Sequence, residues 1–62
     1  MLFHTHSLYF SRSERETERH SFHCLTLGEA MQRCEQEFLE EDDCEQLLLF
    51  DSSYNLLYTF SL

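Results

Sequence analysis

Carboxylates crowd one short stretch of the chain. Seven of the eleven residues from position 35 to position 45 are acidic. These are Glu35, Glu37, Glu40, Glu41, Asp42, Asp43 and Glu45, which we call the acidic segment. The segment contains no lysine, and Arg33 is the only cation near it in the sequence. Clustered carboxylates attract cationic groups, so we predict that these seven residues bind a partner with a basic surface.

The acidic segment occupies a costly position for a helix. The helix that carries its first residues should end near Glu41, and a helix C-terminus bears about half a negative charge. Four consecutive carboxylates, from Glu40 to Asp43, would repel that end. A feature that breaks a local rule without local compensation indicates a function. Neutralising the four residues should therefore raise the melting temperature slightly and weaken partner binding.

The density of charge in the acidic segment suggests what kind of basic surface it fits. Eleven residues at helical rise cover about 16 Å, so the seven charges average about one per 2.3 Å. Duplex DNA carries about one charge per 1.7 Å of axis. A protein site built to hold phosphates could therefore hold this segment instead. The alternative is a run of charge that only keeps the protein in solution.

Histidine and cysteine side chains could form a second kind of site. On strands, His4 and His6 would share one face, and His20 and Cys24 would share another. Imidazole and thiolate ligands suit zinc. However, His23 would point away from His20 and Cys24, and the cysteines lack the spacing of zinc ribbons. We predict no metal and no cofactor, and keep a small His/Cys metal-binding protein as the weaker alternative.

The size of the chain argues against catalysis. With 62 residues we expect a single domain over residues 1–62, which buries about 60% of its unfolded surface. A pocket of several hundred Å³ would hollow out most of such a core. The acids lie in one exposed cluster rather than across a cleft, and no Ser-His-Asp or Cys-His arrangement can be argued. We predict a non-enzymatic protein with no catalytic residues.

The net charge of −8 is unevenly distributed along the chain. Residues 1–26 carry three arginines and three glutamates, whereas residues 27–62 carry nine acids and one arginine. Direct binding to nucleic acid or to an anionic membrane is therefore disfavoured. No apolar run is long enough to span a membrane, the N-terminus lacks the features of a leader, and three cysteines cannot all pair. We expect free thiols in a reducing cytoplasm.

Apolar periodicity predicts the elements that position these residues. Residues 2–10 and 20–25 are typical of strands, with an exposed arm at residues 11–19. Thr26 and Glu29 form a capping box in which each side chain reaches the other's backbone N–H, and Leu25 occupies the position of a hydrophobic staple. The helix that follows has one apolar stripe of Leu27, Ala30, Met31, Cys34 and Phe38.

A hairpin should follow the acidic segment. Residues 46–50 and 54–62 have strand patterns around a polar turn at residues 51–53, and Tyr54 should share a face with Phe60. The fold class is α+β, a small four-stranded, mostly antiparallel sheet with one helix packed on a face, in the order β-β-α-β-β. One helix covers only one face. The other face would present Leu57 and either residues 47 and 49 or residues 48 and 50, so we expect a homodimer.

These expectations favour a small acidic inhibitor or adaptor. It would bind a basic, nucleic-acid-handling site on a protein, in the manner of a nucleic-acid mimic. Many short acidic proteins without catalytic motifs are phage-encoded inhibitors of host enzymes and defence complexes. The chain is similar to these anti-defence and host-takeover proteins in size and charge alone, which would place it in a host cytoplasm. The alternative is an assembly module that binds through its apolar sheet face or an edge strand, with the acids serving solubility.

Overall fold

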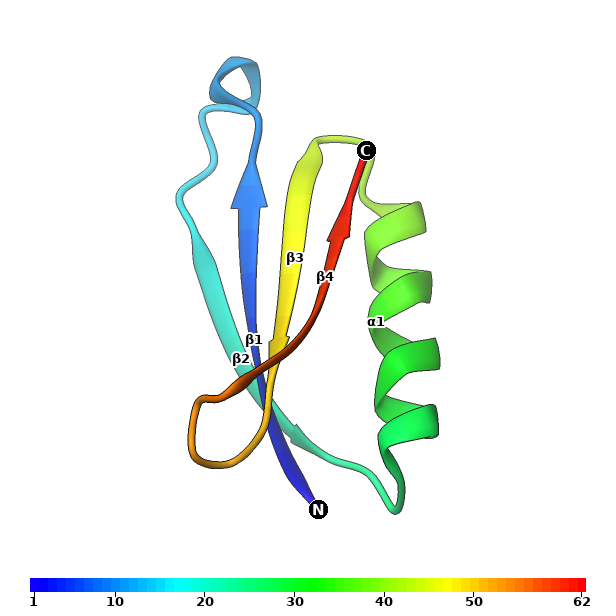
Figure 1. The fold of residues 1–62 in the computed structure, drawn as a ribbon. Coiled ribbons are helices and arrows are strands. Elements are labelled where there is room, and N and C mark those ends of the chain that lie inside the picture. The colour runs from blue at the N-terminus through cyan, green and yellow to red at the C-terminus, as the bar shows by residue number, and fades with distance from the viewer.

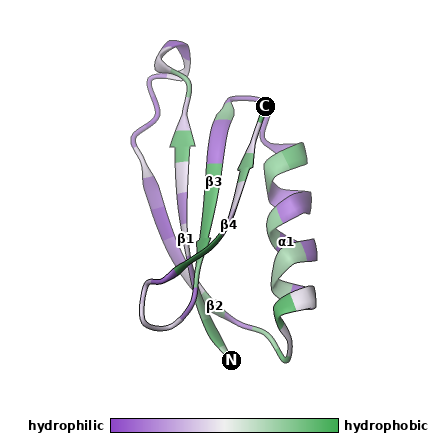
Figure 2. Ribbon diagram, viewed as in Figure 1, coloured by the Kyte–Doolittle hydropathy of each residue, from purple (hydrophilic) through white to green (hydrophobic).

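A computed structural model describes residues 1–62 and shows an α+β fold (Figure 1). Its elements are β1 (Leu2–Tyr9), a 3₁₀ turn (Ser11–Ser13), β2 (Glu18–His23), α1 (Leu27–Glu40), β3 (Cys44–Phe50) and β4 (Leu56–Ser61). The expected order of two strands, one helix and two strands is confirmed. The connection between β1 and β2 is largely hydrophilic, whereas most of β3 is hydrophobic (Figure 2).

The four strands form one antiparallel sheet in the order β2-β1-β3-β4. The first strand of the chain therefore lies in the middle of the sheet, between β2 and β3. The helix α1 connects β2 to β3 and packs on one face of the sheet (Figure 1). Because β1 pairs with both neighbours, its side chains form the floor beneath the helix on one face and the centre of the uncovered face on the other.

Strand alternation decides which side chains form the core. Leu47 and Leu49 are buried beneath α1, whereas Leu48 and Phe50 lie half-buried on the uncovered face. The sequence left open whether residues 47 and 49 or residues 48 and 50 would lie on the uncovered face, and the structure places residues 48 and 50 there. The buried hydrophobic residues are Phe3, Phe22, Ala30, Cys34, Phe38, Cys44, Leu47, Leu49 and Phe60. The helix contributes three of them, all from the predicted apolar stripe, while Leu27 at the start of that stripe is 43% exposed.

The start of α1 is capped by Thr26 as predicted, but two details of the prediction differ from the structure. The backbone N–H of Glu29 donates to the Thr26 hydroxyl at 3.2 Å. The Glu29 carboxylate, however, accepts from the N–H of Leu25 at 3.3 Å rather than from that of Thr26. Leu25 is 82% exposed, so the expected hydrophobic staple does not form. The cap depends on backbone spacing alone, whereas a staple also needs a buried neighbour.

The turn between β3 and β4 is longer than the sequence indicated. The Asp51 carboxylate accepts from the backbone N–H groups of Ser53 and Asn55, both at 2.9 Å. Tyr54 has a φ of 62°, in the left-handed region, and β4 begins only at Leu56. The Tyr54 ring stacks on His4 of the uncovered face, 4.1 Å between centroids. The prediction that Tyr54 shares a face with Phe60 is therefore wrong, because Asp51 organises a loop that turns this ring to the other side.

The single helix of the protein is neither long enough nor apolar enough to cross a membrane.

Candidate functional site

The acidic segment surrounds the C-terminal end of α1. Three of its residues lie on the helix, and Glu41 caps it in an extended conformation. The next two lie in the turn to β3, and Glu45 lies on β3 itself. The even helical spacing assumed for eleven residues is therefore wrong beyond Glu40, because the chain reverses there. The charges gather around one end of the molecule instead of forming a line.

Arg15 supplies a countercharge that the sequence order concealed. Its guanidinium donates to Glu41 at 2.8 Å and to Asp43 at 3.1 Å, and it also pairs with Glu18. The same group lies over the Tyr9 ring, 3.8 Å from the centroid. The expectation that the acids lack local compensation is therefore wrong for two of the seven. The arm that was expected to be an exposed loop folds back and reaches the helix end.

Arg15 connects the arm and β2 to the C-terminal end of α1, and its contacts indicate a structural role. A hydrogen bond from the Tyr9 hydroxyl, 2.8 Å long, and the Arg15 guanidinium hold the pKa of Glu18 below its usual range. Burial, together with the adjacent Glu18, raises the pKa of Tyr9 to about 12. At neutral pH the phenol is thus protonated and the carboxylate ionised. Neither group is suited to exchange a proton with a substrate near pH 7.

The other five acids of the segment form no ion pair. Every ion pair in the structure involves Glu18, Glu41 or Asp43. The last turn of α1 contains no basic residue. We call the remaining members the unpaired acids: Glu35, Glu37, Glu40, Asp42 and Glu45. All five are exposed, so their carboxylates are free to meet a cation from outside the chain.

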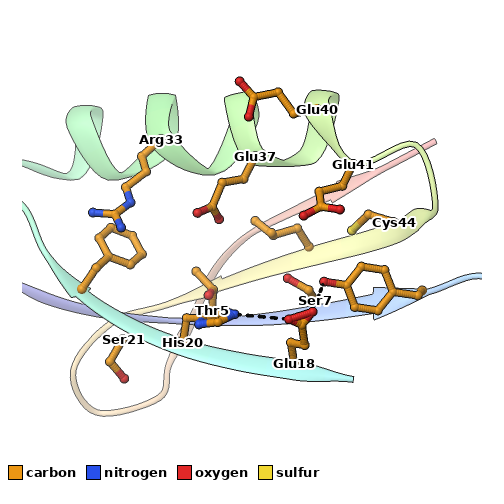
Figure 3. Close-up of a pocket in the computed structure, with 13 residues that line it drawn as sticks. Thr5, Ser7, Glu18, His20, Ser21, Arg33, Glu37, Glu40, Glu41 and Cys44 are labelled. Carbon is orange, nitrogen blue, oxygen red and sulfur yellow. Dashed lines mark hydrogen bonds and ion pairs between the residues drawn. The ribbon is translucent and has the colours of Figure 1, made fainter. Parts of the chain in front are cut away.

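A groove of about 350 Å³ runs between α1 and the strands β1 and β2. Figure 3 shows Glu37 and Arg33 projecting from the helix toward the sheet, whereas Glu40 points away from it. Phe22 and Leu47 form apolar parts of the wall. The Arg33 guanidinium lies over the Phe22 ring, 4.4 Å from its centroid, and makes no ion pair. Two of the unpaired acids, Glu37 and Glu40, line the groove, and Glu37 is the one whose carboxylate points toward the sheet.

Thr5 forms part of the groove floor and has an unmet hydrogen-bonding requirement. The residue is 3% exposed, and its hydroxyl oxygen has no hydrogen-bond partner. A buried hydroxyl without a partner costs about 1–3 kcal/mol. In a chain this short, that cost is a large part of the stability margin. The sequence offered no indication of this feature, because Thr5 lies between two histidines that drew attention to metal binding instead.

The histidines and cysteines do not converge on a metal site. His4 and His6 share the uncovered face as expected, where His4 bonds to Ser21 at 2.7 Å and His6 accepts from Arg19 at 2.7 Å. His20 faces the groove on the other side of the sheet. No group of three or more histidine, cysteine or acidic side chains is placed to hold a metal ion. The structure therefore gives no support to the weaker alternative.

The three thiols are free, and two of them are buried. Burial raises the pKa of Cys34 to about 11 and also raises the pKa of Cys44. Both thiols are thus protonated at neutral pH, and the thiol is the unreactive form of the side chain. The interpretation of Cys34 as a core residue is confirmed, and neither buried thiol has the environment of a nucleophile.

Comparison with models of known protein families, with curated proteins and with solved structures found no match.

Proposed function

We propose that this protein is a non-enzymatic inhibitor or adaptor that binds a basic protein surface through the acidic end of α1. The partner surface that we propose is one that normally holds nucleic acid, because seven carboxylates close together in the chain offer the negative charge that such a surface attracts. The protein would then act as a nucleic-acid mimic by its density of charge, without the regular spacing of phosphates. The single observation that supports this most directly is the set of unpaired acids. Five exposed carboxylates in and around the C-terminal half of α1 make no ion pair, and those nearest the helix end lie in a position that costs stability.

The charge of the whole molecule supports a basic partner. A net charge of −8 on 62 residues repels nucleic acids and anionic membranes at long range and attracts basic proteins. Glu41 and Asp43, which Arg15 holds, remain part of the proposed surface because their contacts with Arg15 are themselves solvent-exposed to a large extent. The free thiols fit a reducing cytoplasm, which is the host cytoplasm if the protein is phage-encoded.

The proposal is tested by capture in the presence of a nucleic-acid competitor. Immobilised protein is incubated with host lysate that has been treated with nuclease, and retained proteins are identified by mass spectrometry. The expected partner is a basic nucleic-acid-binding protein that is released by added duplex DNA and by raising the salt concentration. A partner that stays bound at high salt and in excess DNA would contradict the mimic proposal.

A second function is favoured by one specific observation, the free edge of β4. This strand ends the sheet, carries no charge or proline, and exposes Leu56, Leu57 and Tyr58. The other edge, β2, carries Glu18 and Arg19 and is thus protected against pairing. We propose that two copies pair antiparallel through β4 as a homodimer. The C-terminal end of β4 lies near the C-terminal end of α1 (Figure 1). Antiparallel pairing of two β4 strands would therefore place the two acidic segments at opposite ends of the dimer interface.

Sedimentation across a wide range of concentration tests this assembly. The wild type should sediment as a dimer at high concentration, and Leu57→Lys should shift it to a monomer. Ser52→Lys, in the exposed turn before β4, is the control with the same charge change, and it should leave the dimer intact. A wild type that remains monomeric at millimolar concentration would contradict the pairing.

A further inference from the structure

We infer that the groove between α1 and the β1–β2 part of the sheet is a binding site for a primary alkylammonium group, carried on a lysine side chain of the partner. The inference rests on the proposed function and adds the part of the surface that holds one particular side chain. Two independent observations meet in the groove. One is the unpaired Glu37 carboxylate, and the other is the unpartnered hydroxyl of Thr5.

The chemistry of the groove suits a lysine. Phe22 and Leu47 offer apolar walls for a four-carbon stem, and such stems lie along apolar surface while their charged heads seek polar partners. The head would meet the Glu37 carboxylate, which points from α1 toward the sheet (Figure 3). The groove volume of about 350 Å³ lies at the lower end of the range for ligand clefts. It therefore admits a side chain rather than a folded element.

Thr5 is the floor of this site. Its side chain projects from β1 into the groove (Figure 3), and its oxygen is closed off from solvent in the unbound protein. A threonine side chain has three staggered χ1 positions, so one rotation turns the hydroxyl toward the groove. An ammonium group has three donors and no acceptor. A seated lysine would thus satisfy both the orphaned hydroxyl and the unpaired carboxylate.

The one arginine that lines the groove, Arg33, is held in place by an aromatic ring. Arg33 is held over Phe22 and does not pair with Glu37, although the two are four residues apart on α1. His20 lies 3.7 Å from Glu18 and belongs to the outer wall. The Arg33 charge would oppose an incoming ammonium group. Arg33→Gln should therefore increase the affinity for hexalysine more than Arg12→Gln does, because Arg12 changes the net charge equally but does not line the groove.

The test is an NMR titration of the isotope-labelled full chain with an acetylated, amidated hexalysine peptide at low salt. The largest shifts should fall on the Thr5 methyl group and the Glu37 side chain. Glu37→Gln should raise Kd about tenfold, the loss expected for a charge-assisted hydrogen bond. Glu35→Gln changes the same charge on the same helix but does not line the groove, and should raise Kd less than about threefold.

Thr5→Val separates binding from folding. This variant keeps the shape of the side chain and removes the orphaned hydroxyl, so the free protein should melt at a higher temperature. Its Kd for hexalysine should nevertheless rise about tenfold, as for the loss of a charge-assisted hydrogen bond from the ammonium group. A Thr5→Val protein that melts higher and binds as tightly as the wild type would overturn the role of Thr5.

Other outcomes distinguish the groove from the proposed function. Equal weakening by Glu37→Gln and Glu35→Gln, with no shift at Thr5, would overturn the groove and leave binding by the acidic segment intact. Weakening by neither would overturn both. Spermidine that gives the same shifts at comparable affinity would identify a free amine, rather than a partner's lysine, as the source of the ammonium. Tighter binding of a hexaarginine peptide would overturn the assignment to alkylammonium.

Discussion

Removing the Arg15 side chain should destabilise the protein far more than removing any other exposed charge. The guanidinium makes ion pairs with three carboxylates and lies over the Tyr9 ring. The Arg15 side chain is 36% exposed, and its partners are between 29% and 45% exposed. Solvent screening at this exposure limits each pair to about 0.2–1 kcal/mol. The cation–π contact adds about 0.5–1 kcal/mol.

These contacts together give a loss of about 2 kcal/mol for Arg15→Gln, because ion pairs that share one guanidinium do not add fully. For a domain of this size the change corresponds to a drop of about 10 °C in melting temperature. Urea unfolding and thermal melts measure it. Arg12→Gln is the matched control, since Arg12 lies over the Phe10 ring but pairs with no acid. It should cost no more than about 1 kcal/mol.

Two neighbouring glutamates should respond with opposite signs. Glu41→Gln removes an ion pair with Arg15 and should destabilise, whereas Glu40→Gln relieves repulsion at the helix end and should stabilise by a few tenths of a kcal/mol. High salt should shrink both effects. If Arg15→Gln behaves like Arg12→Gln, or if Glu41→Gln stabilises as much as Glu40→Gln, then Arg15 does not hold the helix end.

The remaining predictions concern the helix cap and the pH dependence. Thr26→Ala should lower the free energy of unfolding by about 1 kcal/mol in a urea titration. A change below about 0.3 kcal/mol would contradict the assignment of Thr26 as the helix cap. The pKa of Tyr9 is raised to about 12 in the folded state, so the protonated phenol stabilises the fold. This contribution to the free energy of unfolding is complete below the ordinary pKa of 10.0 and is lost as the pH rises toward 12. In thermal melts at alkaline pH, Tyr9→Phe should therefore lose less stability than the wild type. The pKa of Asp51 is lowered in the folded state, chiefly by the hydrogen bond from the N–H of Asn55. The ionised carboxylate therefore stabilises the fold above the ordinary pKa of 3.8, and this stabilisation is lost as the pH falls through the lowered folded value. Asp51→Ala should reduce the loss of stability in acid, measured by the same thermal melts.

Features with local causes could be predicted from the sequence. The cap at Thr26 needs only a hydroxyl three residues before Glu29 and so appears in both sequence and structure. The apolar stripe through Ala30, Cys34 and Phe38 follows from helical spacing. Strand alternation left two registers for the third strand, and the structure selects the one that buries Leu47 because β1 and β4 add Phe3 and Phe60 to the same face.

Features with distant causes could not be predicted. Arg15 and Glu41 are 26 residues apart, and only the return of the arm brings them together. The sequence showed alternating arginine and glutamate in that arm, but not which acid each arginine would meet. The orphaned hydroxyl of Thr5 depends on three elements at once: its own strand, β2 beside it and the helix above it. The turn preference of Asp51 indicated that a turn begins there, but not that the Asp51 carboxylate also accepts from Asn55 or that Tyr54 has a left-handed φ.

The most direct test of the proposed function compares two double variants with the same net charge. Glu40→Gln/Asp42→Asn neutralises two unpaired acids at the helix end, and Glu14→Gln/Glu16→Gln neutralises two acids of the arm that make no ion pair. Each variant changes the net charge from −8 to −6. The affinity of both for the basic partner is measured by titration calorimetry between low and high salt. The helix-end variant should lose about tenfold or more in affinity and show a weaker salt dependence, while the arm variant stays near the wild type. Equal affinities of the two variants would contradict the account, because binding would then depend on net charge and not on the acidic end of α1.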